Sequence, residues 1–228
     1  MFVSPDQIAI GLTGELPAAS PLTRTVVLGV DRVGDQVSLQ EQMRPLFVVF
    51  VLFIETLALA SLVAVEIHGR TVTAVLATPA TIGDFLTAKV ILGTLLAFAE
   101  AGLLLAIIGG LAADPLLLLV IVLLGAILVT GLAMVAGSFG RDFLNVMMIS
   151  VLLMLPLMIP AFGVLFPGSP GWWVRALPSF GLVDAIVGVT ADGDGWSQAA
   201  GNLALLGGWC VAVVGAGLVI LRRKVVAL

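Results

Sequence analysis

Five apolar runs, each long enough to cross a lipid bilayer, limit what this chain can fold into. A bilayer core about 30 Å thick needs roughly 20 apolar residues per helix. The composition agrees, because 61% of the residues are hydrophobic and only 11% are charged, against about 25% charged in soluble domains. The sequence therefore predicts an all-α integral membrane protein whose transmembrane domain covers residues 45–228. The five predicted spans are residues 45–65, 90–111, 115–137, 146–166 and 203–221.

The basic residues predict how these spans are oriented. Lys and Arg concentrate on the cytoplasmic side of membrane proteins. If the partly polar segment 66–89 is cytoplasmic, that side collects six of the ten basic residues, namely Arg70, Lys89, Arg141, Arg222, Arg223 and Lys224. We therefore expect a multi-pass protein of the cell (inner or plasma) membrane, with a cytoplasmic C-terminus and an outer N-terminal segment, residues 1–44. Because no signal precedes that outer segment, a further span upstream of the given start is expected, which makes six helices.

A second outer segment, residues 168–190, lies between the fourth and fifth spans. Its Trp172 and Trp173, with Trp196 beyond it, suit the headgroup interface, where amphipathic rings settle. Its apolar part is interrupted by Pro178 and Gly181, so it is too short and too broken to span. We expect a re-entrant or interfacial pair of short helices.

Several kinds of chemistry have no sequence support. The chain has no G-x-x-x-x-G-K-[ST] phosphate loop, no H-E-x-x-H, no G-x-S-x-G and no paired cysteines, and its one histidine is His68. We therefore predict no catalytic residue, no metal site and no cofactor bound by this chain. The net charge of −4 has no basic cluster beside it, so nucleic acid is not an expected partner.

Two acids interrupt the first two spans. Glu55 and Glu100 are each the eleventh residue of their predicted span, which places both near the bilayer midplane. A charge there costs about 2.5 to 3.5 kcal/mol on insertion scales, and no predicted span contains a basic residue to pair with it. These acids are therefore candidates for lining a substrate pathway or holding a proton. The alternative is a neutral carboxyl group hydrogen-bonded to a neighbouring helix.

Two further patterns concern the shape of the bundle. Pro156 and Pro160 lie four residues apart in the fourth span and predict a helix bend, which is either a static kink or a flexing gate. Small residues recur at four-residue spacing and allow close helix packing, either inside the bundle or between subunits. These series are Ala133 with Gly137, Ala136 with Gly140, and Gly208 with Ala212 and Ala216.

The segment between the first two spans reads as a helix, a break and a second helix. Residues 66–77 form a weakly amphipathic pattern suited to the membrane interface. Pro79 ends that helix, because the residue before a proline avoids the α region. Thr81 and Asp84 then match a capping box that opens a new helix running into the second span.

This segment resembles the cytoplasmic segment of type-2 ATP-binding-cassette (ABC) transporter permeases. The likeness lies in the order of Glu66, Arg70, Thr71, Leu76, Thr78, Pro79, Gly83 and Lys89, and it continues through the proline-broken span, W-W-V-R-A-L-P-S-F and the final R-R-K. The resemblance implies six helices per protomer, so we expect the first span of that fold to be missing from the given sequence. It also implies outer re-entrant helices and two protomers, in a homodimer or a heterodimer.

The same resemblance implies a separate ABC ATPase subunit, which binds ATP and Mg. Residues 66–77 would be the coupling helix that receives the movement of the ATPase. The coupling residues carried over are Glu66, His68, Arg70, Thr71, Thr73, Leu76, Thr78 and Pro79. The predicted function is the permease subunit of an ATP-driven exporter of a hydrophobic or amphipathic small molecule or lipid. The alternatives are a proton- or ion-coupled secondary transporter that uses Glu55 and Glu100, and a non-transporting membrane scaffold.

Overall fold

The computed structural model describes residues 39–68, 81–140, 142–164 and 171–226. In these ranges the chain forms helices and no strands, and five of the helices are long and apolar enough to span a membrane. They are α2 (Leu39–His68), α4 (Ile82–Ile107), α5 (Pro115–Phe139), α6 (Phe143–Gly163) and α9 (Trp196–Val226). The predicted all-α fold with five spanning helices is confirmed.

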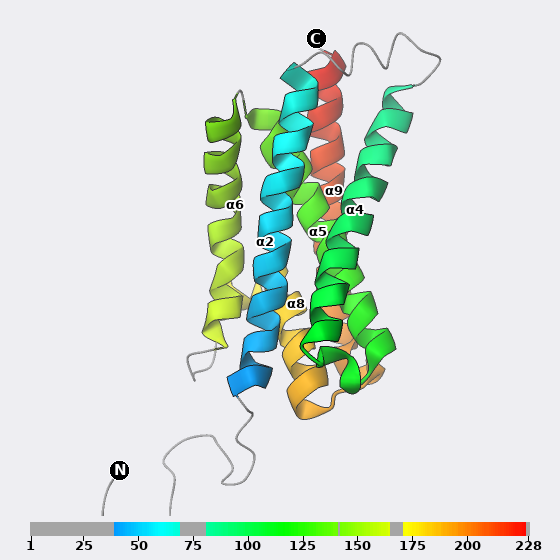
Figure 1. Ribbon diagram of the computed structural model, residues 1–228, viewed down its shortest axis with the longest axis vertical. Helices are drawn as coiled ribbons and strands as arrows, with labels where there is room; N and C mark the ends of the chain where they lie inside the picture. Colours follow the sequence, from blue (N-terminus) through cyan, green and yellow to red (C-terminus); the bar gives the residue numbers. More distant parts are fainter. Residues whose placement is uncertain (1–38, 69–80, 141, 165–170, 227–228) are drawn as a thin grey trace, which may run out of the picture. The chain divides into compact units, whose positions relative to one another are not determined.

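Helix α5 forms the centre of the bundle. The spans run side by side along the long axis of Figure 1, and α5 packs against α2, α4 and α9. Its most apolar stretch is 67% buried inside the protein, whereas the corresponding stretches of α4 and α9 are 22% and 17% buried. The outer helices therefore present most of their apolar surface to lipid or to partners.

Two glycines of α5 let neighbouring helices approach closely. A Cβ atom on Gly137 would lie 2.7 Å from the backbone oxygen of Ala60 on α2, and one on Gly131 would lie 2.9 Å from the backbone nitrogen of Val214 on α9. On α9 itself, the predicted small-residue series Gly208, Ala212 and Ala216 is exposed. The small residues of α5 therefore pack inside the bundle, whereas the series Gly208, Ala212 and Ala216 on α9 faces outward.

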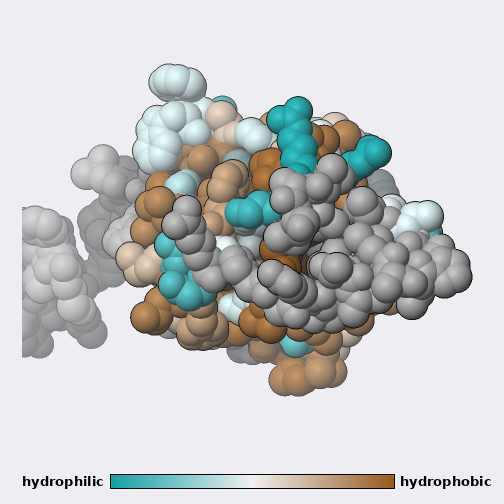
Figure 2. Space-filling model, turned by 90° about the horizontal axis from the view of Figure 1, so that it is seen from above, coloured by the Kyte–Doolittle hydropathy of each residue, from teal (hydrophilic) through white to brown (hydrophobic). Residues whose placement is uncertain are grey.

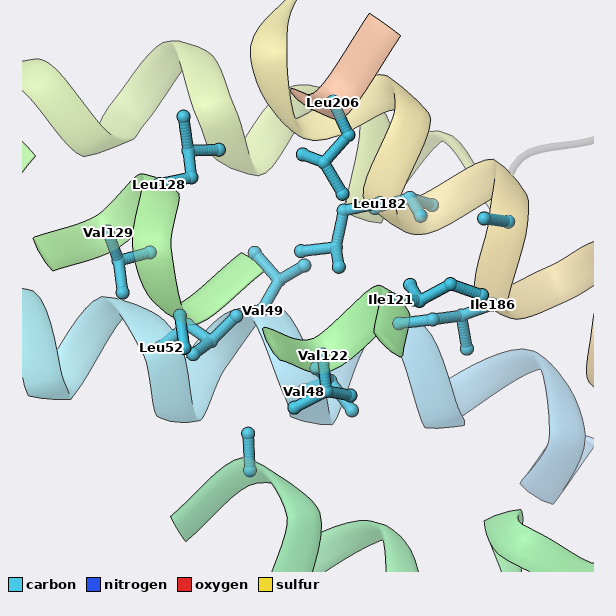
Figure 3. Close-up of a cluster of buried hydrophobic side chains, with 14 of the residues drawn as sticks. Val48, Val49, Leu52, Ile121, Val122, Leu128, Val129, Leu182, Ile186 and Leu206 are labelled. Carbon is cyan, nitrogen blue, oxygen red and sulfur yellow. The ribbon is translucent and has the colours of Figure 1, made fainter. Parts of the chain in front are cut away.

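The apolar core lies where α5 meets α2, α8 (Pro178–Val187) and α9. Figure 3 shows Val48 and Leu52 of α2 and Ile121 of α5 in this cluster, with Leu182 of α8 and Leu206 of α9 among them. Because α8 contributes to the core, the short helix before α9 is part of the packed bundle.

Capping residues set several helix bounds. Asp114 accepts a hydrogen bond from the Leu117 N–H and starts α5, and Asp142 does the same for α6 through the Asn145 N–H. The second span ends at Ile107, before the predicted end at residue 111, and a 3₁₀ turn, η1 (Gly110–Ala112), follows. The chain turns there because Gly109 adopts a left-handed φ of 68°.

Helix α6 continues through both of its prolines, Pro156 and Pro160. The carbonyl oxygen of Leu157, which lies between them, accepts a hydrogen bond of 2.6 Å from the Ser179 hydroxyl of α8. Hydroxyl groups of neighbouring helices commonly satisfy the backbone around transmembrane prolines. The predicted bend at these prolines stays a prediction.

Residues 171–192 form α7 (Trp172–Arg175), α8 and the π-helix η2 (Gly188–Asp192). Pro178 occupies the first turn of α8, where its missing N–H costs no helical hydrogen bond, and Gly181 lies inside the same helix. The interruption thus falls between α7 and α8, just before Pro178. A re-entrant position of these helices in the membrane stays a prediction.

Candidate functional site

Three acidic residues, Glu55 and Glu66 of α2 and Glu100 of α4, lie along the line where these two helices pack, which we call the α2–α4 seam. At one end of the seam, the Lys89 ammonium forms an ion pair with the Glu66 carboxylate. Both side chains are only 17% exposed, and the Lys89 nitrogen also lies 5.8 Å from the centre of the Phe85 ring. The pair joins the last turns of α2 to the first turns of α4.

The start of α4 is fixed by the predicted capping box. The Thr81 hydroxyl oxygen accepts a 3.2 Å hydrogen bond from the Asp84 N–H, and an Asp84 carboxylate oxygen accepts from the Thr81 N–H at 2.9 Å. Two of the backbone N–H groups that a helix start leaves unpaired are thereby satisfied. This prediction from the sequence is confirmed.

The predicted coupling residues fall mostly outside the described residues. Glu66 lies in α2, and His68 is the last residue of this helix. The spanning helix therefore extends into the start of segment 66–77. The other candidates, Arg70, Thr71, Thr73, Leu76, Thr78 and Pro79, lie outside the described residues, and their roles stay predictions. The structure does describe the two helix ends that flank this segment, namely the end of α2 and the start of α4.

Further along the seam, the carboxyl groups of Glu55 and Glu100 lie close enough to interact with each other. Glu55 stands at the middle of the span Met43–Ile67 and is 3% exposed, and its Oε1 atom has no hydrogen-bond partner among the described residues. Glu100 is exposed on α4. The structure thus brings together the two acids that the sequence singled out, one inside the bundle and one on its surface.

The two pairs share one register. Glu55 precedes Glu66 by eleven residues on α2, and Glu100 follows Lys89 by eleven residues on α4. Eleven residues are about three helical turns, or roughly 16 Å. Both pairs therefore lie on the same side of this antiparallel helix pair, with complementary charges at one end and two acids further along.

A small apolar pocket lies on the seam between the two pairs. Its walls come from α2, α4 and α5, namely Leu59, Leu62, Val63, Lys89, Leu92, Thr130, Ala133 and Met134. Thr130 contributes the polar atom of the α5 wall, and its hydroxyl is engaged with the Ala126 carbonyl oxygen at 2.8 Å. The pocket is therefore apolar, with Lys89 at one end.

The end of the bundle that carries the ion pair also carries other charged groups. In Figure 1 the C-terminal ends of α2 and α9 lie beside the N-terminal end of α4, and Arg222, Arg223 and Lys224 are exposed near the end of α9. Figure 2 looks onto this end and shows hydrophilic side chains standing among apolar ones. The cytoplasmic position of this end stays a prediction from the distribution of basic residues.

The sequence reasoning missed the partnership of Glu66 with Lys89. A signal was present, because the eleven-residue spacing recurs on both helices and helices repeat their faces at that interval. Applying that spacing to two antiparallel neighbours would have paired the four residues two by two.

Comparison with protein families identifies the chain over most of its length. A family model described as ABC-2 family transporter protein matches residues 31–219. Comparisons with curated proteins and with solved structures give no match. The matched range contains all four residues of the two seam pairs.

Proposed function

The chain belongs to the ABC-2 transporter permease family, and from that premise we propose that it serves in an ATP-driven exporter and receives the movement of an ATPase through residues 66–77. Members of this family are membrane subunits of ABC transporters rather than enzymes. The family implies an ATPase partner and usually a second membrane subunit. In the proposal, ATP and Mg bind to the ATPase, and this chain contributes the pathway.

The observation that carries the coupling role is the ion pair at the base of the segment. Lys89 and Glu66 tie the end of α2 to the start of α4, and the capping box at Thr81 fixes where α4 begins. A force applied to the intervening residues would therefore act on two spanning helices whose ends are already joined. Packed helices transmit such a displacement because cores deform little.

The direction of the chain supports the same assignment. The basic residues Arg222, Arg223 and Lys224 lie at the end of the bundle where α2 ends and α4 begins. Because Lys and Arg favour the cytoplasmic side, we propose that this end and the C-terminus are cytoplasmic, where an ATPase can reach ATP. The substrate we propose is a hydrophobic or amphipathic small molecule or lipid, since the outer helices and the pocket on the seam are apolar.

A second candidate function is supported by the acid pair. Glu55 and Glu100 interact within the spanning part of the protein, and carboxyl groups at that depth often belong to proton relays. A proton-coupled secondary transporter would depend on these acids and on a proton gradient, without ATP.

The proposal is tested with the chain purified together with its ATPase and reconstituted in liposomes. We expect stable association, and we expect Arg70→Glu to abolish ATP-stimulated transport while leaving insertion and assembly intact. A matched control is Arg175→Glu, the same charge reversal at an exposed residue of α7, at the other end of the bundle. Wild-type coupling in the Arg70→Glu protein would refute the coupling role, and transport driven by a proton gradient without ATP would favour the second candidate.

A further inference from the structure

The α2–α4 seam presents a buried acceptor, a surface acid and an apolar pocket in a row. The Glu55 side chain is only 3% exposed, and its Oε1 oxygen lacks a hydrogen-bond donor among the described residues. A buried acceptor without a donor costs about 1 to 3 kcal/mol, and more when it is charged. Glu100, which reaches the same point from α4, adds a second carboxyl group and no donor when ionised.

A ligand that satisfies this point must bring positive charge and hydrogen-bond donors. A proton shared between the two carboxyl groups supplies one donor but leaves the pair with one negative charge. An alkylammonium group supplies three N–H donors and one positive charge, enough to serve both carboxyl groups.

A metal ion fits these surroundings less well. Hard divalent cations take six or more oxygen ligands, and the described part of the chain has no group of three or more His, Cys, Asp or Glu residues placed so that they could hold a metal ion together. No basic residue of the described spans lies at this depth to compete for the acids, since Lys89 is held by Glu66 three turns away.

The surroundings of the acid pair suit an apolar tail. Leu92, Leu96 and Leu103 are exposed on the face of α4 that also carries Glu100, and Leu62 of α2 is exposed beside the pocket. The pocket itself lies between the acid pair and Lys89 and is lined mainly by Leu, Val, Ala and Met. An acyl or alkyl chain extending from the acids would lie along this surface, and the exposure of Glu100 leaves the acids open from the side of the bundle.

We propose that Glu55, Glu100 and the adjoining apolar pocket of the α2–α4 seam bind an amphipathic organic cation with N–H donors, its charged group at the acids and its apolar part along the seam. The inference rests on the proposed transport function and gives its substrate a chemical class. It assigns Glu55 as the buried anchor and Glu100 as the surface contact.

The test uses the full chain with its ATPase in lipid nanodiscs and tritiated dodecylamine as the probe, with empty nanodiscs as background. We expect saturable binding that excess dodecylamine displaces and dodecanol, a neutral amphiphile of equal chain length, does not. Glu55→Gln should weaken binding at least tenfold and Glu100→Gln at least threefold. Glu55→Asp, which keeps the charge, should weaken it less than Glu55→Gln does.

The matched control is Asp184→Asn, which removes a carboxylate that accepts a hydrogen bond from Asn202 on the exposed surface of α8, and it should bind dodecylamine as the wild type does. Folding is checked by the protection of the buried Cys210 thiol from a maleimide dye. If Glu55→Gln fails this check, Glu55→Asp and Glu100→Gln decide. Equal displacement by dodecanol, or unchanged binding in the folded Gln variants, overturns the inference while ATP-stimulated transport leaves the proposed function standing. If dodecylamine binds as expected but ATP-stimulated transport is absent, the proposed function fails and the inference about this binding site stands.

Discussion

Two residue pairs on the α2–α4 seam lie in the same register of the two helices but combine their charges differently. Where α2 ends and α4 begins, Glu66 meets Lys89, and these opposite charges, which we call the edge pair, join the two helices. Three turns away, Glu55 meets Glu100, and these two acids, which we call the acid pair, have no basic partner among the described residues. A seam built only for stability would carry complementary groups at both points, because a charge at that depth is costly to insert.

The difference teaches that the edge pair and the acid pair have separable roles. The edge pair stabilises the helix ends that flank the proposed coupling segment. The acid pair, Glu55 with Glu100, places two carboxyl groups together with no cation among the described residues, an arrangement that is typical of functional sites. Substitutions that give one pair the charges of the other pair are therefore the sharpest test of the comparison.

The largest effect on stability is expected when the edge pair is made into a pair of two acids, like the acid pair. Lys89→Glu replaces an ion pair with two like charges between side chains that are 17% exposed. Exposed pairs contribute up to about 1 kcal/mol and broken buried pairs cost 3 to 5 kcal/mol, so we expect a loss of about 2 kcal/mol. Stability is measured by the rate at which the one cysteine, Cys210, reacts with a thiol dye on heating.

We also expect this variant to lose most ATP-stimulated transport, because α2 and α4 are no longer joined at the proposed coupling end. The control is Lys224→Glu, the same substitution at an exposed residue of α9, which should cost no more than about 1 kcal/mol as a lost helix-terminal charge. Equal losses in the two variants would show that the ion pair has no special role.

An intermediate effect is expected from giving the acid pair the character of the edge pair. Glu100→Lys places an ammonium within reach of Glu55, so we expect the protein to gain about 1 kcal/mol of stability and to lose dodecylamine binding at least tenfold. Both changes are measured on one preparation, by thermal thiol labelling and by scintillation proximity. A fall in thermal stability together with intact amine binding would contradict the view that these acids lack a cation.

The smallest effect is expected at the start of α4. Thr81→Ala removes the side-chain cap and should cost about 1 kcal/mol, with a few degrees lost in Tm. Thr87→Ala is the matched control, because Thr87 is an exposed threonine inside the same helix and its loss should change stability by less than about 0.5 kcal/mol. The cap explanation fails if Thr87→Ala lowers Tm as much as Thr81→Ala.

Much of the fold could be predicted because the length and hydropathy of an apolar run are enough to identify a spanning helix. The start of α5 at Pro115 and the capping box at Thr81 follow from local chemistry that needs no neighbour. The end of α4 was harder, because the residues up to 111 are apolar, and it depends on the left-handed conformation of Gly109.

The site was only half predictable for a different physical reason. Glu55 and Glu100 stand out in apolar spans, yet α4 is apolar on all sides, so periodicity cannot say which face is buried. The burial of Glu55 and the exposure of Glu100 depend on how α2 and α4 pack. The pairing of Glu66 with Lys89 likewise needs the register between two helices, which composition does not contain.

The central claim is that an ATPase acts on the end of the bundle where α2 ends and α4 begins. A photoreactive amino acid placed at Arg70, and in a second protein at the exposed Ala113 at the other end of α4, tests this in the reconstituted transporter. The account predicts an adduct with the ATPase subunit from position 70 and none from position 113, with a yield at position 70 that changes when ATP is added. An ATPase adduct from position 113, or none from position 70 in an assembled and active complex, would contradict it.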